Sequence, residues 1–249
     1  MTDESRSAEN QSRRRFLKQS GIALGGAIVG GVIGNLLPDM RKEKAAVPET
    51  APTKNYNQAL MYFNQEQFNI TEAAAERIFP SDDLGPGAAE LGVAYYIDHQ
   101  MASQWGWNGR EYMTAPFFKG ESTQGDYPMV KRHEFFSEGL DTMQRMSQSK
   151  YGKPFPELTP EQQDELLGVI DKGDQVEIRG GSSKAFFNLL RNMTIEGVYS
   201  DPLYGGNKDM QGWKMRNYPG NQMSYLNIMD KDKFVTIAPS SLHDHLTVH

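Results

Sequence analysis

The sequence predicts an all-α protein: a compact, irregular helical domain with long aromatic and Gly-rich loops, preceded by a signal or anchor helix and a linker. Several segments repeat apolar residues at helical spacing, and no run of alternating apolar and polar residues marks a strand. The stretches between these segments are rich in Gly, Pro and aromatic residues. We therefore divide the chain into a signal or anchor at 1–37, a linker at 38–60 and a helical domain at 61–249.

The N-terminal segment has the layout of an export signal. A run of Ser-Arg-Arg-Arg-Phe-Leu-Lys is followed by Ile22–Leu37, sixteen uncharged residues of which five are glycine. A charged segment before an apolar one is typical of export, and the arginine pair is typical of the twin-arginine route, which carries folded proteins. The motif residues are Ser12, Arg13, Arg14, Phe16, Leu17 and Lys18. We therefore predict recognition by the twin-arginine translocase.

The sequence leaves the fate of this leader open. No clean Ala-x-Ala site follows it, and Ala45, Ala46 and Ala51 are only approximate candidates for cleavage. A helix of this length spans about 24 Å, which is shorter than the ~30 Å hydrocarbon core of a bilayer, although Gln19–Gly21 extend it. Both a removed signal and an uncleaved membrane anchor fit. Either way, we expect the protein at the periplasmic or extracytoplasmic face of the membrane.

Composition limits the class of protein. The roughly 200 residues after the leader suffice for one core, and 38% apolar with 23% charged residues predicts that they fold. There is no cysteine, which excludes disulfides, thiol catalysis, iron–sulfur ligation and covalent c-type haem attachment. Residues 1–46 carry eight Lys/Arg against five Asp/Glu, so the rest has 18 against 27, a charge of −9. Such an acidic body argues against nucleic-acid binding.

Three helices are predicted in the first half of the domain. Thr71 precedes Glu72–Phe79, which Pro80 stops before a dense turn signal. Ala88–Gln104 resumes a helix whose apolar residues lie on two faces, which predicts burial. Met129–Ser149 repeats apolar residues at i, i+4 and i+7.

Capping signals predict two further helices. Thr159–Gln162 supplies an N-cap threonine, a first-turn proline and a glutamine at the third helical position. Ser182 or Ser183 caps a helix that runs to about Tyr199. Beyond Tyr199 the chain is predicted to be loop-like.

No familiar catalytic or cofactor motif is found. There is no Gly-x-Gly-x-x-Gly at a helix start, no Gly-x-x-x-x-Gly-Lys-Ser/Thr loop and no His-Glu-x-x-His. Gly205-Gly206 lacks the strand–turn–helix context of a phosphate site. We interpret it as a tight turn, with close backbone approach to a partner as the functional alternative. We therefore predict no catalytic residue, cofactor or metal in this chain.

A second hypothesis is a free-standing exported enzyme or metal-binding protein. Its candidate groups are Asp82, Asp83, Asp98, His99 and His133. Asp82 and Asp83 are also expected to hydrogen-bond their own backbone in a turn, because they lie beside Gly and Pro. Asp98 and His99 fit a buried polar pair and a solvated helix edge equally well. His243–His245 is interpreted as part of a frayed tail, with adventitious metal binding as the weaker alternative.

Aromatic residues concentrate outside the predicted helices. The connection Trp105–Pro128 and the stretch Trp213–Tyr218 are the two examples. Such residues either fold back over the core or form a protein contact surface, where Trp, Tyr and Met are enriched. Because no catalytic constellation is present, we favour the contact surface.

Two long segments resemble the gluconate 2-dehydrogenase subunit 3 family. The first is Ile78–Val93 (IFPSDDLGPGAAELGV), followed by Tyr96–Asp98. The second is Glu196–Met210 (EGVYSDPLYGGNKDM) with Gly212–Lys214, closing at Tyr218–Gly220. The similarity runs from about Phe68 to Gly220, and a twin-arginine leader is also usual in that family.

The resemblance implies a role in a complex. Family members are small subunits of membrane-associated, flavin-dependent sugar and sugar-acid dehydrogenases. A large flavoprotein subunit holds FAD and oxidises the substrate, and a haem-carrying cytochrome c subunit often takes the electrons. The small subunit is non-catalytic, supplies the export signal and assists maturation of the flavoprotein. The resemblance does not fix the substrate.

The same resemblance suggests which residues contact the flavoprotein. We take the most distinctive positions of both segments as the candidate partner interface. They are Asp82, Asp83, Gly85, Pro86, Gly87, Asp201, Pro202, Tyr204, Gly205, Gly206, Asn207, Trp213 and Lys214.

Overall fold

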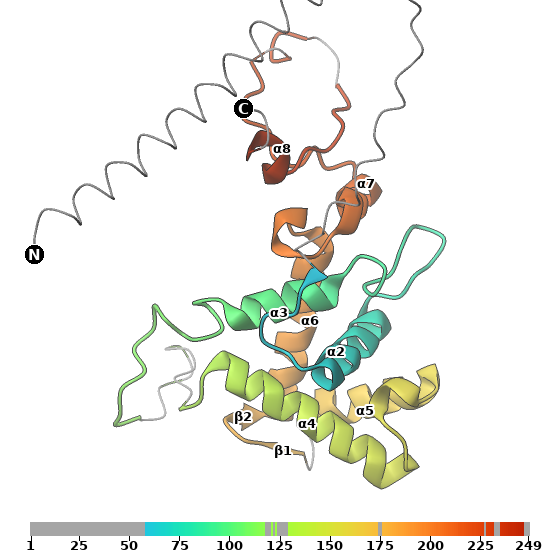
Figure 1. Ribbon diagram of the computed structural model, residues 1–249, viewed down its shortest axis with the longest axis vertical. Helices are drawn as coiled ribbons and strands as arrows, with labels where there is room; N and C mark the ends of the chain where they lie inside the picture. Colours follow the sequence, from blue (N-terminus) through green and yellow to red (C-terminus); the bar gives the residue numbers. More distant parts are fainter. Residues whose placement is uncertain are drawn as a thin grey trace, which may run out of the picture. The chain divides into compact units, whose positions relative to one another are not determined.

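The computed structural model describes residues 58–117, 121, 123, 129–173, 176–226, 228–231 and 235–246. The predicted leader and residues 38–57 of the predicted linker lie outside them. Within the described residues the chain is mostly helical, in agreement with the predicted class (Figure 1). No helix in this part of the chain is both long enough and apolar enough to cross a membrane.

Helix α2, Gln65–Ile78, begins seven residues earlier than predicted. Asn64 is its N-cap, and the Asn64 side chain accepts a hydrogen bond from the Gln67 backbone N–H at 2.8 Å. Thr71, which the sequence indicated as the cap, lies inside the helix, where its hydroxyl donates to the Gln67 carbonyl. The asparagine and glutamine three residues apart form the capping box that fixes the true start.

Helix α3, Val93–Ala102, begins later than the predicted start at Ala88. Gly92 precedes it with φ +71°, a left-handed conformation that interrupts a helix. Residues 88–92 form turns instead. The prediction of burial is confirmed: Val93, Ile97 and Met101 are all inaccessible to solvent.

Helices α4 and α5 form the next pair. Helix α4, Arg132–Tyr151, ends at Gly152 in the left-handed conformation that commonly terminates helices. A short 3₁₀ turn, η2, Phe155–Glu157, leads to α5, Pro160–Lys172. The predicted cap of α5 is confirmed, because the Thr159 side chain accepts from the Gln162 backbone N–H.

A minimal hairpin precedes the central helix. Strands β1, Glu177–Ile178, and β2, Gly181–Ser182, pair antiparallel. Helix α6, Ser183–Tyr199, follows with Ser182 as its N-cap, as one of the two predicted alternatives had it. Helix α6 packs against α2, α3, α4 and α5 and is the common partner of the bundle.

Beyond α6 the chain forms short turns, and the loop-like prediction holds for most of it. These elements are η3, Pro202–Tyr204; η4, Lys208–Met210; α7, Gln211–Met215; and α8, Leu242–Leu246.

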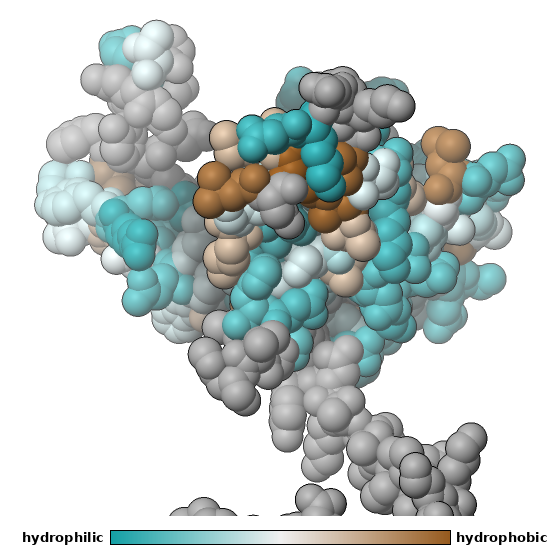
Figure 2. Space-filling view, turned by 90° about the horizontal axis from the view of Figure 1, so that it is seen from above, coloured by the Kyte–Doolittle hydropathy of each residue, from teal (hydrophilic) through white to brown (hydrophobic). Residues whose placement is uncertain are grey.

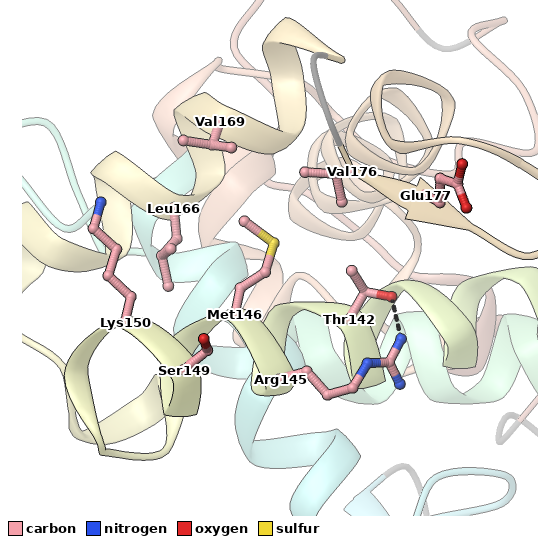
Figure 3. Close-up of a pocket in the computed structure, with 9 residues that line it drawn as sticks. All are labelled: Thr142, Arg145, Met146, Ser149, Lys150, Leu166, Val169, Val176 and Glu177. Carbon is pink, nitrogen blue, oxygen red and sulfur yellow. Dashed lines mark hydrogen bonds between the residues drawn. The ribbon is translucent and has the colours of Figure 1, made fainter.

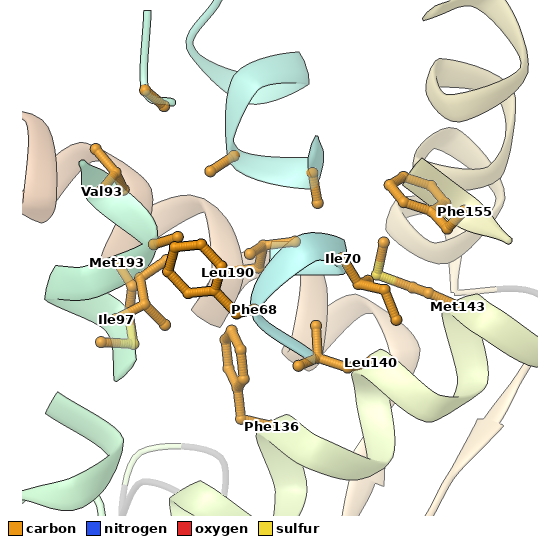
Figure 4. Packing of buried hydrophobic residues seen from close by; sticks show 14 of the residues in the cluster. Phe68, Ile70, Val93, Ile97, Phe136, Leu140, Met143, Phe155, Leu190 and Met193 are labelled. Atoms are coloured by element: carbon orange, nitrogen blue, oxygen red, sulfur yellow. The ribbon is translucent and has the colours of Figure 1, made fainter. Parts of the chain in front are cut away.

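The core lies between α2, α3, α4 and α6. Figure 4 shows Phe68 and Ile70 of α2, Phe136 and Leu140 of α4 and Leu190 of α6 directed toward one another. Burying each such side chain contributes about 1.5–3 kcal/mol to stability. This packing holds the ends of α3 and α6 beside each other, which positions the site described next.

Candidate functional site

The fold brings the two distinctive segments of the sequence together. The turn between α2 and α3 lies against the chain that leaves α6, and the Lys208 backbone N–H donates to the Leu91 carbonyl at 3.1 Å. A hydrogen bond from Tyr96 to Glu196 joins α3 to α6 at the same place. We call residues 79–93 and 201–214 the signature junction. Segments more than a hundred residues apart in sequence thus form one local structure.

Glycines make this close approach feasible. A Cβ on Gly206 would lie 2.2 Å from the Gly197 carbonyl oxygen, and one on Gly212 would lie 2.0 Å from that of Val198. Both obstacles are backbone atoms, which cannot swing away as a side chain can. The predicted tight turn at Gly205-Gly206 is confirmed, since Gly205 has φ +107° and its amide closes the η3 turn.

The backbone of the second segment is strained. Asn207, Asp209 and Met210 all have positive φ values, between 48° and 57°, within four residues. Such conformations cost about 1–2 kcal/mol each for residues with a Cβ and persist only where surrounding contacts impose them. Here the contacts come from Asn207, whose buried amide donates to the Ser200 carbonyl and accepts from the Gly212 backbone N–H, both at 2.8 Å.

The junction presents a mixed surface to solvent. Leu84, 82% exposed, and Tyr204, 47% exposed, project from the two segments. Asp82, Asp83 and Lys214 are exposed beside them. Large apolar side chains that remain exposed next to a rigid, strained backbone are typical of a contact surface.

Four candidate interface residues are buried beneath this surface: the glycines Gly87 and Gly206, and two residues with large polar side chains, Asn207 and Trp213. Trp213 is buried, and its indole N–H donates to the Tyr199 carbonyl at 2.7 Å. Asn207 is fully buried. We therefore assign both to the framework of this chain, because their polar groups are already satisfied internally.

The aspartates of the junction organise their own backbone. Asp82 accepts from the Leu84 backbone N–H at 2.8 Å and forms a two-way backbone bridge with Gly85, as expected for a turn. Asp201 accepts from the Leu203 backbone N–H with one oxygen and from the Leu242 N–H with the other.

Glu76 is a residue that the sequence reasoning missed. Its carboxylate accepts from the backbone N–H groups of Ser81 and Ala89 at 3.0 and 2.9 Å. It therefore holds both sides of the first segment, and a Cβ on Gly87 would collide with it. Only its position four residues before Pro80, in the last turn of a helix, hinted at this role.

Asp98 is a buried carboxylate with a structural role. It accepts hydrogen bonds from three successive backbone N–H groups, those of Met61, Tyr62 and Phe63, at 2.6 to 3.0 Å. It is fully buried, so the buried alternative for Asp98 is the correct one. Neighbouring His99 is half-buried, and its Nε2 contacts the Ala59 carbonyl. Together they fix the entry of the chain into the domain.

The residues of the metal-site hypothesis are not brought together. Asp98 is occupied as described, and His133 is buried with its Nδ1 3.0 Å from the Gly106 carbonyl. Among the residues that the structure describes, no group of three or more His, Asp or Glu side chains could hold a metal ion.

Tyr96 has a perturbed hydroxyl between α3 and α6. Burial, together with the nearby Glu196 carboxylate, raises the pKa of Tyr96 well above its ordinary value. The phenol therefore stays protonated and donates to Glu196 at 3.2 Å. This hydrogen bond links the two helices.

A second exposed surface is the aromatic–cation cluster of Trp105, Trp107, Lys131 and Arg132. The Lys131 ammonium lies 4.6 Å from the centre of the Trp107 ring, and the Arg132 guanidinium lies 4.6 Å from that of Trp105. Both indoles remain more than a third exposed. Trp and Arg held in fixed positions are the commonest anchors of protein interfaces.

Polar contacts hold this cluster in place. Arg132 pairs with Glu111 at 2.6 Å, and Asn108 donates to Glu111 and accepts from the Arg132 backbone N–H. Burial opposes ionisation of Glu111, but these hydrogen bonds outweigh it and lower its pKa. The exposed part of the predicted aromatic contact surface is therefore built on an organised framework.

The chain matches one known family. Residues 65–220 match the family model described as Gluconate 2-dehydrogenase subunit 3, which includes both segments of the junction and more than half of the chain. The chain belongs to this family. The match confirms the resemblance stated from the sequence. No curated protein and no solved structure matches this chain.

The family name marks this subunit 3 protein as an accessory subunit of a multi-subunit dehydrogenase. The described residues also form a groove on the surface. The groove encloses about 500 Å³ between α4, α5 and β1 (Figure 3). Met146, Leu166 and Val169 form its apolar wall, while Arg145 turns to donate to the Thr142 hydroxyl at 2.8 Å. At its rim, Lys150 pairs with Glu165.

Proposed function

We propose that this chain is the non-catalytic small subunit of an exported, flavin-dependent gluconate or sugar dehydrogenase. It accompanies the flavoprotein subunit through the twin-arginine route and helps that subunit to mature. FAD belongs to the flavoprotein, and haem belongs to a cytochrome c subunit where one is present. The complex resides at the extracytoplasmic face of the membrane, and the leader anchors it there if it is not cleaved.

The observation that carries this proposal is the family match over residues 65–220, which follows a predicted twin-arginine leader. A flavin held without a covalent bond must be loaded in the cytoplasm, so its protein has to cross the membrane folded. A small subunit with its own leader can supply the export signal for such a protein. The signature junction and the aromatic–cation cluster offer exposed apolar anchors on fixed backbone for that association.

Affinity capture tests the association. The tagged chain, purified from membranes in mild detergent, should carry a second protein with the absorbance spectrum of an oxidised flavin. A chain that purifies alone and without flavin contradicts the proposal.

Tyr204→Ala tests the site. Because Tyr204 is half-exposed and no side-chain hydrogen bond of its hydroxyl is found among the described residues, we expect little change in the unfolding temperature. Binding of the flavoprotein should weaken by roughly tenfold, as for one interface anchor. Trp213→Ala is the matched comparison, since it removes a buried ring and should destabilise the fold itself by about 3–5 kcal/mol.

A further inference from the structure

The first segment of the signature junction closes into a loop at the end of α2. The Ala88 backbone N–H donates to the Phe79 carbonyl at 2.9 Å, which joins the two ends of residues 79–88. Within the loop, Asp82 and Gly85 exchange backbone hydrogen bonds at 3.1 and 3.2 Å. A loop whose ends meet in this way keeps its shape on a fixed base.

Two backbone N–H groups of this loop converge on one carboxylate. The Oε1 atom of Glu76 accepts from the Ser81 N–H at 3.0 Å, and the Oε2 atom accepts from the Ala89 N–H at 2.9 Å. Because Ser81 and Ala89 lie near opposite ends of the loop, a single carboxylate holds both ends. Hydrogen bonds to an ionised carboxylate are about twice as strong as those between neutral groups. Converging backbone N–H groups are also a common way to bind anions.

The space that this carboxylate fills depends on a glycine. Gly87 is buried, and a Cβ on it would lie 2.3 and 2.4 Å from the two carboxylate oxygens of Glu76. The same Cβ would lie 2.5 Å from the Ser81 backbone nitrogen. A side chain at position 87 would therefore take the place of the carboxylate. We call residues 79–89, with their two converging N–H groups and this open space, the carboxylate cradle.

A second carboxylate lies near the cradle without entering it. Burial and, to a smaller extent, the charge of Glu76 raise the pKa of Glu72, which lies one helical turn earlier in α2. No hydrogen bond from the described residues contributes to that pKa. The exact position of Glu76 on the helix, and not a general excess of acidic groups, therefore determines which carboxylate fills the cradle.

The cradle carries an exposed tip, Asp82–Gly85. Apolar residues stand amid hydrophilic ones on the face of the molecule shown in Figure 2. Leu84, at the tip, is 82% exposed, more than any other large apolar side chain of the described residues. Because so little of this side chain contacts the rest of the chain, the backbone of the cradle determines where it points.

We propose that residues 79–89 form a carboxylate-binding site and that Glu76 is the positioning residue that fills it and fixes the exposed tip for a partner. The part that concerns the partner rests on the proposed function. The site itself is a property of this chain alone. It should therefore accept a free monocarboxylate once the Glu76 carboxylate is removed.

Chemical rescue of the full-length chain tests the site. Glu76→Ala removes one carbon and the carboxylate, which are the atoms that acetate supplies, and should lower the unfolding temperature by about 3–8 °C. Acetate at about 100 mM should raise the unfolding temperature of this variant by about 2–4 °C relative to chloride at equal ionic strength. Acetamide, which is neutral, should not. Hydrogen exchange of the Ser81 and Ala89 amides should be faster in the variant and slower again in acetate.

The controls separate the site from a general effect of the anion. In wild type the cradle is filled, so acetate and chloride should act alike. Glu76→Ala combined with Gly87→Ala fills the open space with a Cβ and should show no rescue. Glu72→Ala removes the neighbouring carboxylate and should not respond to acetate. A response of equal size in all these chains indicates an adventitious ion only and overturns the proposal, as does the absence of any response in Glu76→Ala.

Binding of the copurifying flavoprotein tests the positioning role. Glu76→Ala should weaken this binding by about threefold to tenfold, and acetate should restore most of the lost affinity. Unchanged affinity of Glu76→Ala overturns the positioning role and leaves the proposed function intact. Failure of the wild-type chain to bind any flavoprotein overturns the proposed function, whereas the acetate response still decides whether the cradle binds a carboxylate.

Discussion

At the scale of single residues, Asp98 shows how one buried group fixes the start of the domain. Its carboxylate receives three backbone N–H groups, so it holds residues 61–63 in one conformation without any disulfide. Asparagine has only one acceptor oxygen. We therefore expect Asp98→Asn to leave at least one of the three N–H groups without its acceptor and to lower the free energy of unfolding by about 1–3 kcal/mol.

Urea unfolding measures this loss, and limited proteolysis should show faster cleavage near residue 60. His99→Gln is the control, because glutamine can still donate to the Ala59 carbonyl. Equal stability of Asp98→Asn and wild type would show that the three hydrogen bonds contribute no net stability.

Substitution of glycine by alanine should have opposite effects on stability at two positions of the chain. Gly206→Ala places a Cβ 2.2 Å from the Gly197 carbonyl oxygen, so it should destabilise the chain by about 1–3 kcal/mol and distort the signature junction. Gly168→Ala adds a methyl group inside α5 with nothing within 4 Å, so it should stabilise the chain by about 0.5–1 kcal/mol. Thermal unfolding of both variants gives the signs, and two shifts in the same direction would contradict this account.

The residue scale also shows where sequence reasoning succeeds. Asp82 could be assigned to a turn because its neighbours Gly and Pro are local signals. Trp213 could not be assigned to the interior, because a tryptophan in a loop looks the same whether it covers the core or awaits a partner. Its burial depends on the Tyr199 carbonyl, fourteen positions earlier. Long-range partners of this kind leave no local pattern.

At the scale of elements, helix starts were predictable where the capping signal was unambiguous. Thr159 with Pro160 correctly predicted the start of α5, and Ser182 was one of the two predicted caps of α6. The predicted start of α2 was wrong because Thr71 was taken as the N-cap, whereas Asn64 and Gln67 form the capping box. A threonine inside a helix can bond its own backbone, so its presence alone does not locate an end.

An ion pair between α2 and α5 gives a pH-dependent prediction. Arg77 donates two hydrogen bonds to the Asp164 carboxylate, both at 2.8 Å. The hydrogen bond from Arg77 lowers the pKa of Asp164. Because Asp164 is half-exposed, we expect Asp164→Asn to cost less than about 1 kcal/mol at pH 7.

The lowered pKa of Asp164 determines how the contribution of the ion pair to stability changes with pH. The ionised form is stabilised in the folded state, so the contribution is complete above the unfolded-state pKa of about 4 and is lost as the pH falls below it. Urea unfolding at pH 7 and near pH 3 should therefore show the difference between wild type and Asp164→Asn shrinking. In an Arg77→Ala background, where the ion pair is already absent, Asp164→Asn should show no such trend.

At the scale of the whole molecule, the sequence indicated both halves of the signature junction but not their contact. Residues 78–93 and 196–214 were singled out separately, and only the packing of α3 on α6 brings them together. The contact between Asn221 and Ser240 had no sequence signal, because it is made by backbone hydrogen bonds. Sequence patterns therefore predicted the two segments separately, while tertiary packing determines the surface that they form together.

The leader supports a prediction about two proteins at once. Replacing Arg13 and Arg14 by Lys should leave this chain in the cytoplasm, because the translocase reads the arginine pair. If the flavoprotein depends on this chain for export, it should also remain in the cytoplasm, folded and with its flavin. Fractionation followed by immunoblotting and flavin assay measures both locations.

The control attaches the wild-type leader directly to the flavoprotein in cells that lack this chain. Export of that fusion should recover, because the address no longer depends on this chain, and its flavin content shows whether maturation still needs the small subunit. If the exported fusion contains its full flavin, this chain serves only to direct export. If the exported fusion lacks flavin, this chain also takes part in maturation. A flavoprotein that reaches the outside without the fusion, while this chain stays inside, contradicts the escort role even where the two subunits bind.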